Sequence, residues 1–277
     1  MKGKSVGFLC EIYDISRSSY YKNKVKVKPQ KEIQDEILSQ LITEYHLTYN
    51  QTLGYRRMRL FINKLNQTKY SEGYIHRLMK YLGIMSRIRR KKVNRKKTNP
   101  DYFKDNILDR NFTADKPNEK WLTDVTEFKI PGTTQKLYLS PILDLYDKSI
   151  VTYELSHRNT NQIVFKMFDK AIKENPKAKP LFHSDRGFQY TSNNFKLKIE
   201  KHEFNQSMSR PGKCIDNGPM EGFFGTLKCE MFHGRKFESY ESLIKAIRKY
   251  IEYYNNGRFQ AKLKGMAPME YRNHALA

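Results

Sequence analysis

The sequence predicts an α/β protein that is preceded by a separate basic, helical unit. Two changes near residue 119 support this division, one in the spacing of apolar residues and one in charge. Up to residue 118 the apolar spacing is helical, and the chain holds 26 basic and 11 acidic residues. From residue 119 the balance is 26 to 18, and three predicted strands precede alternating helices and strands. That order of elements is typical of α/β domains.

The N-terminal part contains several amphipathic segments. Two short helices are predicted within 6–22 and a longer one over 30–46. The segments 50–65 and 71–84 form a helical pair, and the first of them carries Arg56, Arg57 and Arg59. A helical pair in a basic context favours a helix-turn-helix-like module. We therefore expect residues 1–86 to bind DNA, with these three arginines among the contacts.

A run of positive charge follows the helical unit. Residues 87–97 contain eight Lys or Arg in eleven positions. Such a run is most often a solvated linker, and here we expect a flexible tether that also contacts phosphates. Prolines 100 and 117 interrupt regular structure beyond it, so 87–118 is assigned as a basic linker. Its predicted DNA contacts are Arg87, Arg89, Arg90, Lys91, Lys92, Arg95, Lys96 and Lys97.

The second part of the chain, 119–277, is predicted to form the α/β domain. Its strands are expected at 121–130, 136–147, 148–156, 180–185 and 204–209. Its helices are expected at 161–174, 191–202, 215–231 and 241–255. Trp121, the only tryptophan, is expected to lie in the core.

Composition restricts the class of partner. With 52 Lys and Arg against 29 Asp and Glu, the formal charge is +23, which implies a polyanion and nucleic acid before membrane. The three cysteines form no CxxC pair, so neither a zinc site nor a disulfide framework is indicated. No apolar stretch approaches the ~18 residues of a membrane span. We expect a cytoplasmic, nucleoid-associated protein with no membrane contact.

Three acids occupy informative positions. Asp124 lies within the first predicted strand, where acids are unfavourable. Asp185 follows the fourth strand, and Glu221 lies in a helix with 35 residues between them. Carboxylates from separate elements can bind the divalent ions of phosphoryl transfer. A lone acid in a basic chain is more often a surface charge, so spacing alone leaves both interpretations open.

The residues around the three acids resemble a known family. PNEKWLTDVTEF, LFHSDRGFQYTS and SRPGKCIDNGPMEGFFGTLKCE resemble the catalytic signature of bacterial insertion-sequence transposases. The closest branch is the IS-three family, in its second-frame product, within the retroviral-integrase superfamily. LGYRRMRLFINK, YIHRLMKYLGI and the tail YIEYYNNGRFQAKLKGMAPMEYR resemble that family as well. The resemblance therefore covers nearly the whole chain.

The resemblance implies a fold, a reaction and a site. The fold would be RNase H-like, a five-stranded mixed sheet flanked by helices, with a C-terminal helical extension. The reaction would be cleavage and strand transfer of double-stranded DNA without a covalent enzyme–DNA intermediate. Asp124, Asp185 and Glu221 would be the catalytic triad and would bind Mg²⁺ or Mn²⁺, two ions per site.

Neighbouring residues have more than one interpretation. His183 and Arg186 flank the second Asp and would either contact DNA phosphate or orient the loop. Lys228 lies two turns beyond Glu221 on the same helical stripe, which favours a DNA contact over a solvated lysine. Glu230 is expected to be a surface acid.

The resemblance also implies partners and leaves rival functions. In this family an upstream reading frame usually supplies a further helix-turn-helix and zipper segment. We therefore expect a partner or fused upstream segment and a homo-oligomer on DNA. The alternatives are a non-catalytic DNA-binding modulator of transposition and a nuclease of the RNase H type. A triad of carboxylates in a DNA-binding protein favours the enzyme over the modulator.

Overall fold

The computed structural model describes residues 5–24, 29–88, 105–130 and 136–276. The chain divides into two units, Met1–Ser86 and Arg87–Ala277. Most of the basic run lies outside the described residues, so its predicted DNA contacts remain sequence-based. Those residues are Arg89, Arg90, Lys91, Lys92, Arg95, Lys96 and Lys97.

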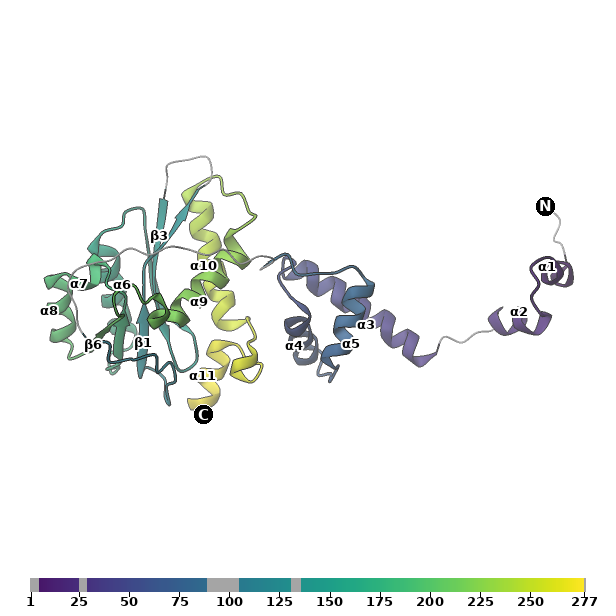
Figure 1. Ribbon diagram of the computed structural model, residues 1–277, viewed down its shortest axis with the longest axis horizontal. Helices are drawn as coiled ribbons and strands as arrows, with labels where there is room; N and C mark the ends of the chain where they lie inside the picture. The colour runs from purple at the N-terminus through teal and green to yellow at the C-terminus, as the bar shows by residue number, and fades with distance from the viewer. Residues whose placement is uncertain (1–4, 25–28, 89–104, 131–135, 277) are drawn as a thin grey trace. The chain divides into compact units, whose positions relative to one another are not determined.

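The N-terminal unit is entirely helical in its described part (Figure 1). Its helices are α1 (Val6–Ile12), α2 (Arg17–Lys24), α3 (Gln30–Thr48), α4 (Tyr55–Leu65) and α5 (Glu72–Tyr81). Helices α3, α4 and α5 pack together around Leu38, Ile42, Phe61 and Leu78, all of which are buried. Ser71 caps α5, since its hydroxyl accepts the N–H of Tyr74 at 3.3 Å. The predicted helical pair is therefore α4 and α5, packed on α3.

The second unit is built on one mixed sheet. Its strands are β1 (Lys120–Thr123), β2 (Thr126–Lys129), β3 (Lys136–Asp144), β4 (Ile150–Ser156), β5 (Leu181–Ser184) and β6 (Asn205–Met208). β3 pairs antiparallel with β1, β2 and β4, whereas β5 pairs parallel with β1 and with β6. Both strand directions occur, as the sequence-based expectation of a mixed sheet requires.

β1 and β2 are two parts of one interrupted strand. Trp121 pairs with Asp144 and Thr123 with Ile142, while Thr126 pairs with Leu139 in the same unshifted register. The six labelled strands therefore fill five positions across the sheet, in the order β4, β3, β1 with β2, β5 and β6. The interruption falls at Asp124 and Val125.

Helices cover both faces of the sheet (Figure 1). One face packs against α9 (Gly218–Leu227) and α10 (Tyr240–Asn256), through Leu122, Leu139, Phe223 and Ile247. The opposite face packs against α6 (Asn161–Glu174), α7 (Phe188–Thr191) and α8 (Asn193–Lys201). Trp121 is fully buried in that second layer, which confirms its predicted place in the core. The result is a three-layer α/β domain of the RNase H-like kind.

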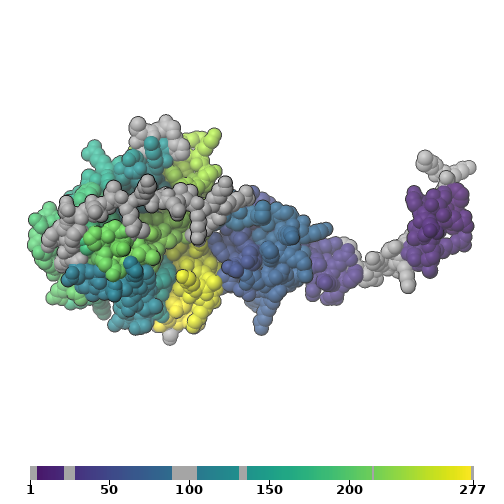
Figure 2. All heavy atoms as spheres, viewed as in Figure 1, coloured from purple at the N-terminus to yellow at the C-terminus, as the bar shows by residue number. Residues whose placement is uncertain are grey.

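Shorter helical turns complete the domain. η1 (Cys214–Asn217) leads into α9, and η2 (Lys228–Phe232), a π-helical turn, follows it. η3 (Ala261–Leu263) and α11 (Pro268–Leu276) form the C-terminal end. The space-filling view shows the residues of α11, in yellow, at the surface of this unit (Figure 2). Arg272 of α11 nevertheless reaches inward and pairs with the buried carboxylates of Asp144 and Asp147.

The segment before β1 belongs to the second unit. The N–H of Met208 donates to the Asp105 carbonyl at 3.4 Å, and the N–H of Leu108 donates to the Ser207 hydroxyl at 3.1 Å. These contacts lay residues 105–108 along β6, which is an edge strand of the sheet. Leu108 itself is buried. Part of the linker assigned over 87–118 is thus packed against the domain rather than free.

None of the helices in the described part of the chain is both long enough and apolar enough to cross a membrane.

Candidate active site

Asp124 lies at the interruption between β1 and β2. Its Oδ1 accepts the N–H of Val125 at 2.7 Å. The carboxylate therefore hydrogen-bonds to the backbone at the point where the regular pairing of the strand with β3 is interrupted. The sequence places Asp124 inside a strand, where an acid is unfavourable. The structure accommodates it because the regular strand stops at Thr123 and resumes at Thr126.

Asp185 directly follows β5, in a tight turn that opens α7. The N–H of Gly187 donates to Asp185 Oδ1 at 2.9 Å. A Cβ at residue 187 would lie 3.0 Å from that same oxygen and 2.9 Å from the Gln189 side chain. A glycine at this position therefore allows the close approach that holds the carboxylate.

The topology brings Asp124 and Asp185 together. β1 and β5 are parallel neighbours, with Leu122 paired to His183, so both strands end at the same edge of the sheet. The Asp124 and Asp185 carboxyl groups are close enough to share a hydrogen bond. Burial raises the pKa of Asp124 well above its usual value, and the negative charges of Asp185 and Glu221 raise it further. Burial also raises the pKa of Asp185.

Glu221 reaches the same region from a different layer. It lies on the solvent-exposed side of the first turn of α9, while Met220, Phe223 and Phe224 anchor the other side of that helix in the core. The negative charge of Glu221 raises the pKa of Asp124, so Glu221 lies near that aspartate. Within the described residues, no three His, Cys, Asp or Glu side chains already stand close enough to enclose a metal ion.

Lys228 contributes the positive charge beside this group. Its ammonium lies 5.3 Å from the centre of the Phe128 ring and acts to lower the pKa of Asp124. It begins the π-helical turn that follows α9. π-helical turns inside helices are frequent at functional sites.

His183 does not contact solvent, and its predicted role in binding DNA phosphate is wrong. The ring is fully buried, with Nδ1 at 2.9 Å from the Ser207 hydroxyl and Nε2 at 3.1 Å from the Ser209 hydroxyl. Burial lowers the pKa of His183 to about 4, so the ring is neutral at pH 7. Its place in a central strand covered on both faces explains the burial. The alternative interpretation, that it orients the loop before Asp185, agrees with these contacts.

Arg186 is half-buried and has a structural contact. Its Nε donates to the Ser209 carbonyl at 2.5 Å, which links the Asp185 turn to the end of β6. Contact with DNA through the rest of the guanidinium stays a prediction.

Glu230 is not a surface acid, contrary to the sequence-based expectation. It is 5% exposed and pairs with Arg258, whose NH2 lies 2.8 Å from Glu230 Oε1. The Tyr250 hydroxyl donates to Glu230 Oε2 at 3.0 Å. Two partners that are 20 and 28 residues away satisfy the buried charge.

The predicted arginines of the helical unit, Arg56, Arg57 and Arg59, all lie on α4. Arg56 is exposed and pairs with Glu72 at 2.7 Å, and the Arg57 guanidinium lies 5.8 Å from the centre of the Phe61 ring. Arg59 has a buried Nε with no hydrogen-bond partner among the described residues. Arg87, the first residue of the basic run, is half-buried, and its Nε and NH2 likewise have no such partner. Their contacts with DNA stay predictions.

A second basic surface, which the sequence analysis missed, lies on α5. Gly73, His76, Arg77 and Lys80 are all exposed and fall on one face of the helix. The opposite face carries Ile75, Leu78 and Met79, which are buried. The sequence could have predicted this surface, because the residues opposite the apolar stripe of an amphipathic helix face the solvent.

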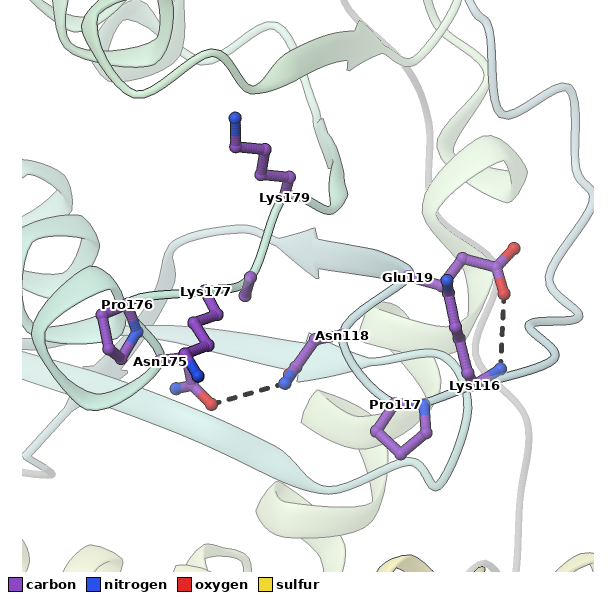
Figure 3. Close-up of a pocket in the computed structure, with 9 residues that line it drawn as sticks. Lys116, Pro117, Asn118, Glu119, Asn175, Pro176, Lys177 and Lys179 are labelled. Carbon is purple, nitrogen blue, oxygen red and sulfur yellow. Dashed lines mark hydrogen bonds between the residues drawn. The ribbon is translucent and has the colours of Figure 1, made fainter. Parts of the chain in front are cut away.

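A large pocket of the second unit is at the other end of these strands. It holds about 740 Å³ and is lined by the loops 116–119 and 175–179, including Lys116, Lys177 and Lys179 (Figure 3). These loops precede β1 and β5, whereas the aspartates follow them. Asn118 and Asn175 bridge the two loops at 3.5 Å. The carboxylate cluster therefore lies outside this pocket.

Comparison with known proteins now identifies the family. Two integrase core domain models match residues 114–214 and 221–276, and an HTH-like domain model matches residues 32–92. The putative transposase InsK for insertion sequence element IS150 of Escherichia coli (strain K12) is 39% identical over 262 residues, covering 94% of this chain and 90% of that protein. The chain belongs to the insertion-sequence transposases of the IS-three family.

Two further likenesses are weaker. The transposase InsF for insertion sequence IS3A of Escherichia coli (strain K12) is 26% identical over 285 residues, covering 99% of this chain and 96% of that protein. A solved HTLV-2 integrase catalytic core domain is 18% identical, with a TM-score of 0.42, and matches 57% of this chain and 97% of that chain. The transposase is an enzyme of the integrase superfamily of polynucleotidyl transferases.

Proposed function

We propose that the transposase cuts and joins double-stranded DNA with Asp124, Asp185 and Glu221 as its catalytic carboxylates. The observation that supports the proposal is that β1 and β5 are parallel neighbours, so that Asp124 and Asp185 follow adjacent strands at one edge of the sheet. The two aspartates lie within hydrogen-bonding reach, and the charge of Glu221 acts on Asp124. Acids gathered in this way on a basic protein oppose DNA binding unless cations offset their charge.

The donor set fits Mg²⁺ or Mn²⁺. All three side chains offer carboxylate oxygens, the ligands that hard divalent ions prefer. The repulsion that raises the pKa of Asp124 is what a bound cation would relieve. Glu221 is exposed on the first turn of α9. When bound, two such ions would activate the attacking oxygen and stabilise the leaving one.

The chain's own residues would orient the reaction. The Val125 and Gly187 N–H groups each bind Oδ1 of one aspartate and so fix the orientation of the two carboxyl groups. Lys228, beside the carboxylates, would meet a DNA phosphate and fix the strand near them. Water would first cut at the end of the element, and the freed 3′-hydroxyl would then attack a target phosphodiester.

The helical unit would position the DNA, and other chains would complete the assembly. The exposed face of α5 offers His76, Arg77 and Lys80 for groove and phosphate contacts. We propose an upstream-frame protein or fused segment as a partner, and a homo-oligomer that brings two element ends together. The reaction would take place in the bacterial cytoplasm at the nucleoid, where the DNA is.

The activity can be tested on labelled DNA that carries the ends of the element. We expect nicking and strand transfer in Mg²⁺ or Mn²⁺, with the upstream-frame partner supplied, and neither product in a chelator. DNA binding by the helical unit should persist in the chelator. A protein that binds the ends but makes neither product under any of these metal conditions would contradict the proposal.

The exposed face of α5 gives a separate prediction about binding. Replacing Arg77 and Lys80 with Ala should weaken DNA binding and reduce the slope of log affinity against log salt by about 0.9 for each phosphate that the protein no longer neutralises. Lys31, an exposed lysine near the start of α3, is the matched control. Salt titrations followed by fluorescence anisotropy measure both. An unchanged slope in the Arg77 and Lys80 variant would show that DNA uses another face.

A further inference from the structure

Two adjacent residues, Asp216 and Asn217, are linked by hydrogen bonds, directly or through one neighbouring segment, to the segments that carry the proposed catalytic acids. Both are buried, and they end the short turn η1 directly before α9. Asn217 Nδ2 donates to the carbonyl of Thr123 at 3.0 Å, and Thr123 directly precedes Asp124. This bond ties the start of α9 to the end of β1.

The side chain of Asp216 makes the second connection, at the end of β6. Its Oδ2 accepts the N–H of Arg210 at 3.0 Å. The N–H of Ser209, which directly precedes Arg210, donates to the carbonyl of Ser184 at 3.0 Å, and Ser184 directly precedes Asp185. The Ser209 hydroxyl also lies 3.1 Å from Nε2 of the buried His183 ring on β5. The Asp185 segment is therefore fixed against the same turn that begins the helix of Glu221.

The side chain of Asp216 anchors this turn. It is 0% exposed and accepts three hydrogen bonds from Arg210, through the backbone N at 3.0 Å, Nε at 2.8 Å and Nη2 at 2.9 Å. Arg110 Nε donates at 2.7 Å and Asn106 Nδ2 at 3.1 Å. Charge-assisted bonds of this kind are stronger than neutral ones. Two arginines from separate segments of the chain therefore hold the turn in place.

The position of Glu221 depends on this anchor. Glu221 follows Asn217 by four residues, about one helical turn, with Pro219 near the start of α9. A helix transmits the placement of its first turn directly to a side chain one turn later. Metal ligands must be held to within about 0.5 Å to be effective.

We propose that Asp216 and Asn217 form the positioning element that sets Glu221 in register with Asp124 and Asp185. This inference rests on the proposed function, because it needs Glu221 to be a metal ligand. Asp216 and Asn217 are positioning residues and do not themselves touch substrate or metal. They act by fixing the position of the first turn of α9, which carries Glu221.

A double-mutant cycle on Mn²⁺ affinity tests the proposal in the full-length, metal-free protein. The four proteins are the unmodified chain, Asp216→Asn, Glu221→Gln and the double variant, each titrated with Mn²⁺ by calorimetry. Asp216→Asn alone should weaken Mn²⁺ binding about 10-fold or more, as the loss of an outer support typically does. In the Glu221→Gln background the same change should alter affinity by less than about 2-fold, because the ligand it positions is already removed.

Asp109→Asn is the matched control. Asp109 is an exposed acid that contacts the same arginine, with Arg210 NH1 at 3.4 Å, but it lies outside the η1 turn that leads into α9. Its replacement should leave Mn²⁺ affinity unchanged. Should Asp216→Asn fail to fold, Asn217→Ala removes the Thr123 bond alone and should give the same pattern.

The outcomes separate the two proposals. An equal loss of affinity from Asp216→Asn with and without Glu221 would show a general structural role and overturn the positioning role, as would no loss at all. A Glu221→Gln variant that binds Mn²⁺ as well as the unmodified chain would overturn the metal site itself, and with it this inference.

Discussion

Replacing Glu221 with Gln is expected to abolish nicking and strand transfer while leaving DNA affinity nearly unchanged. The change keeps the length of the side chain on the exposed first turn of α9 and removes the negative charge that a divalent cation requires. Metal-based stabilisation of a transition state is worth several kcal/mol. A loss of about 4 kcal/mol corresponds to roughly 10³-fold in rate. Single-turnover cleavage and anisotropy binding assays, run side by side, measure the two effects.

The control for this variant follows from the structure. Glu230 is unsuitable, because it is buried and paired with Arg258. Glu238 is exposed, lies beyond the π-helical turn and has the same side chain, so Glu238→Gln should retain full activity. Wild-type rates in Glu221→Gln, measured with the upstream partner present, would refute the assigned triad.

Replacing Glu230 with Gln is expected to destabilise the catalytic unit by about 3–5 kcal/mol. The reason is that removing one member of a buried ion pair leaves the other charge uncompensated. Arg258 is only 14% exposed, and its guanidinium donates to both oxygens of Glu230. The pair joins the π-helical turn to the chain after α10, so its loss should loosen the region around Lys228 as well. Urea unfolding followed by the fluorescence of Trp121, the only tryptophan, reports on this unit.

A paired substitution checks the cause of that loss. Replacing Glu230 and Arg258 together with Met should cost less than the Glu230 change alone, because no buried charge is then left without a partner. Glu238→Gln should change stability by no more than about 0.5 kcal/mol, as an exposed substitution normally does. A Glu230→Gln variant as stable as the parent would show that solvent already compensates Arg258.

Much of the site could be predicted from local patterns. The sequence placed Asp185 just beyond a strand and Glu221 on the polar side of a helix anchored by Phe223 and Phe224, as the structure has them. Both predictions depend only on neighbouring residues and on the regular spacing of apolar residues. Asp124 was located to the correct strand, but the interruption there was not foreseen, since its register is defined by pairing with β3.

The errors concern polar residues whose partners are distant in sequence. A contact with DNA phosphate was one of two interpretations of His183 because it flanks Asp185, yet Ser207 on β6 and Ser209 just beyond it contact its ring inside the sheet. Glu230 was expected at the surface because acids usually are, yet Arg258 makes burial possible. A polar group can be buried only where a hydrogen-bond or ion-pair partner reaches it. Local patterns in a single sequence do not reveal which distant residue will be that partner.

The segment 105–112 determines where the catalytic unit can be separated from the rest of the protein. An isolated fragment beginning at residue 119 would remove the residues that lie along β6 and would take Arg110 and Asn106 away from Asp216. An uncovered edge strand pairs readily with other chains and promotes aggregation. A protease that cut between 112 and 119 would leave that covering strip held only by noncovalent contacts. A well-behaved fragment must therefore begin at or before residue 105.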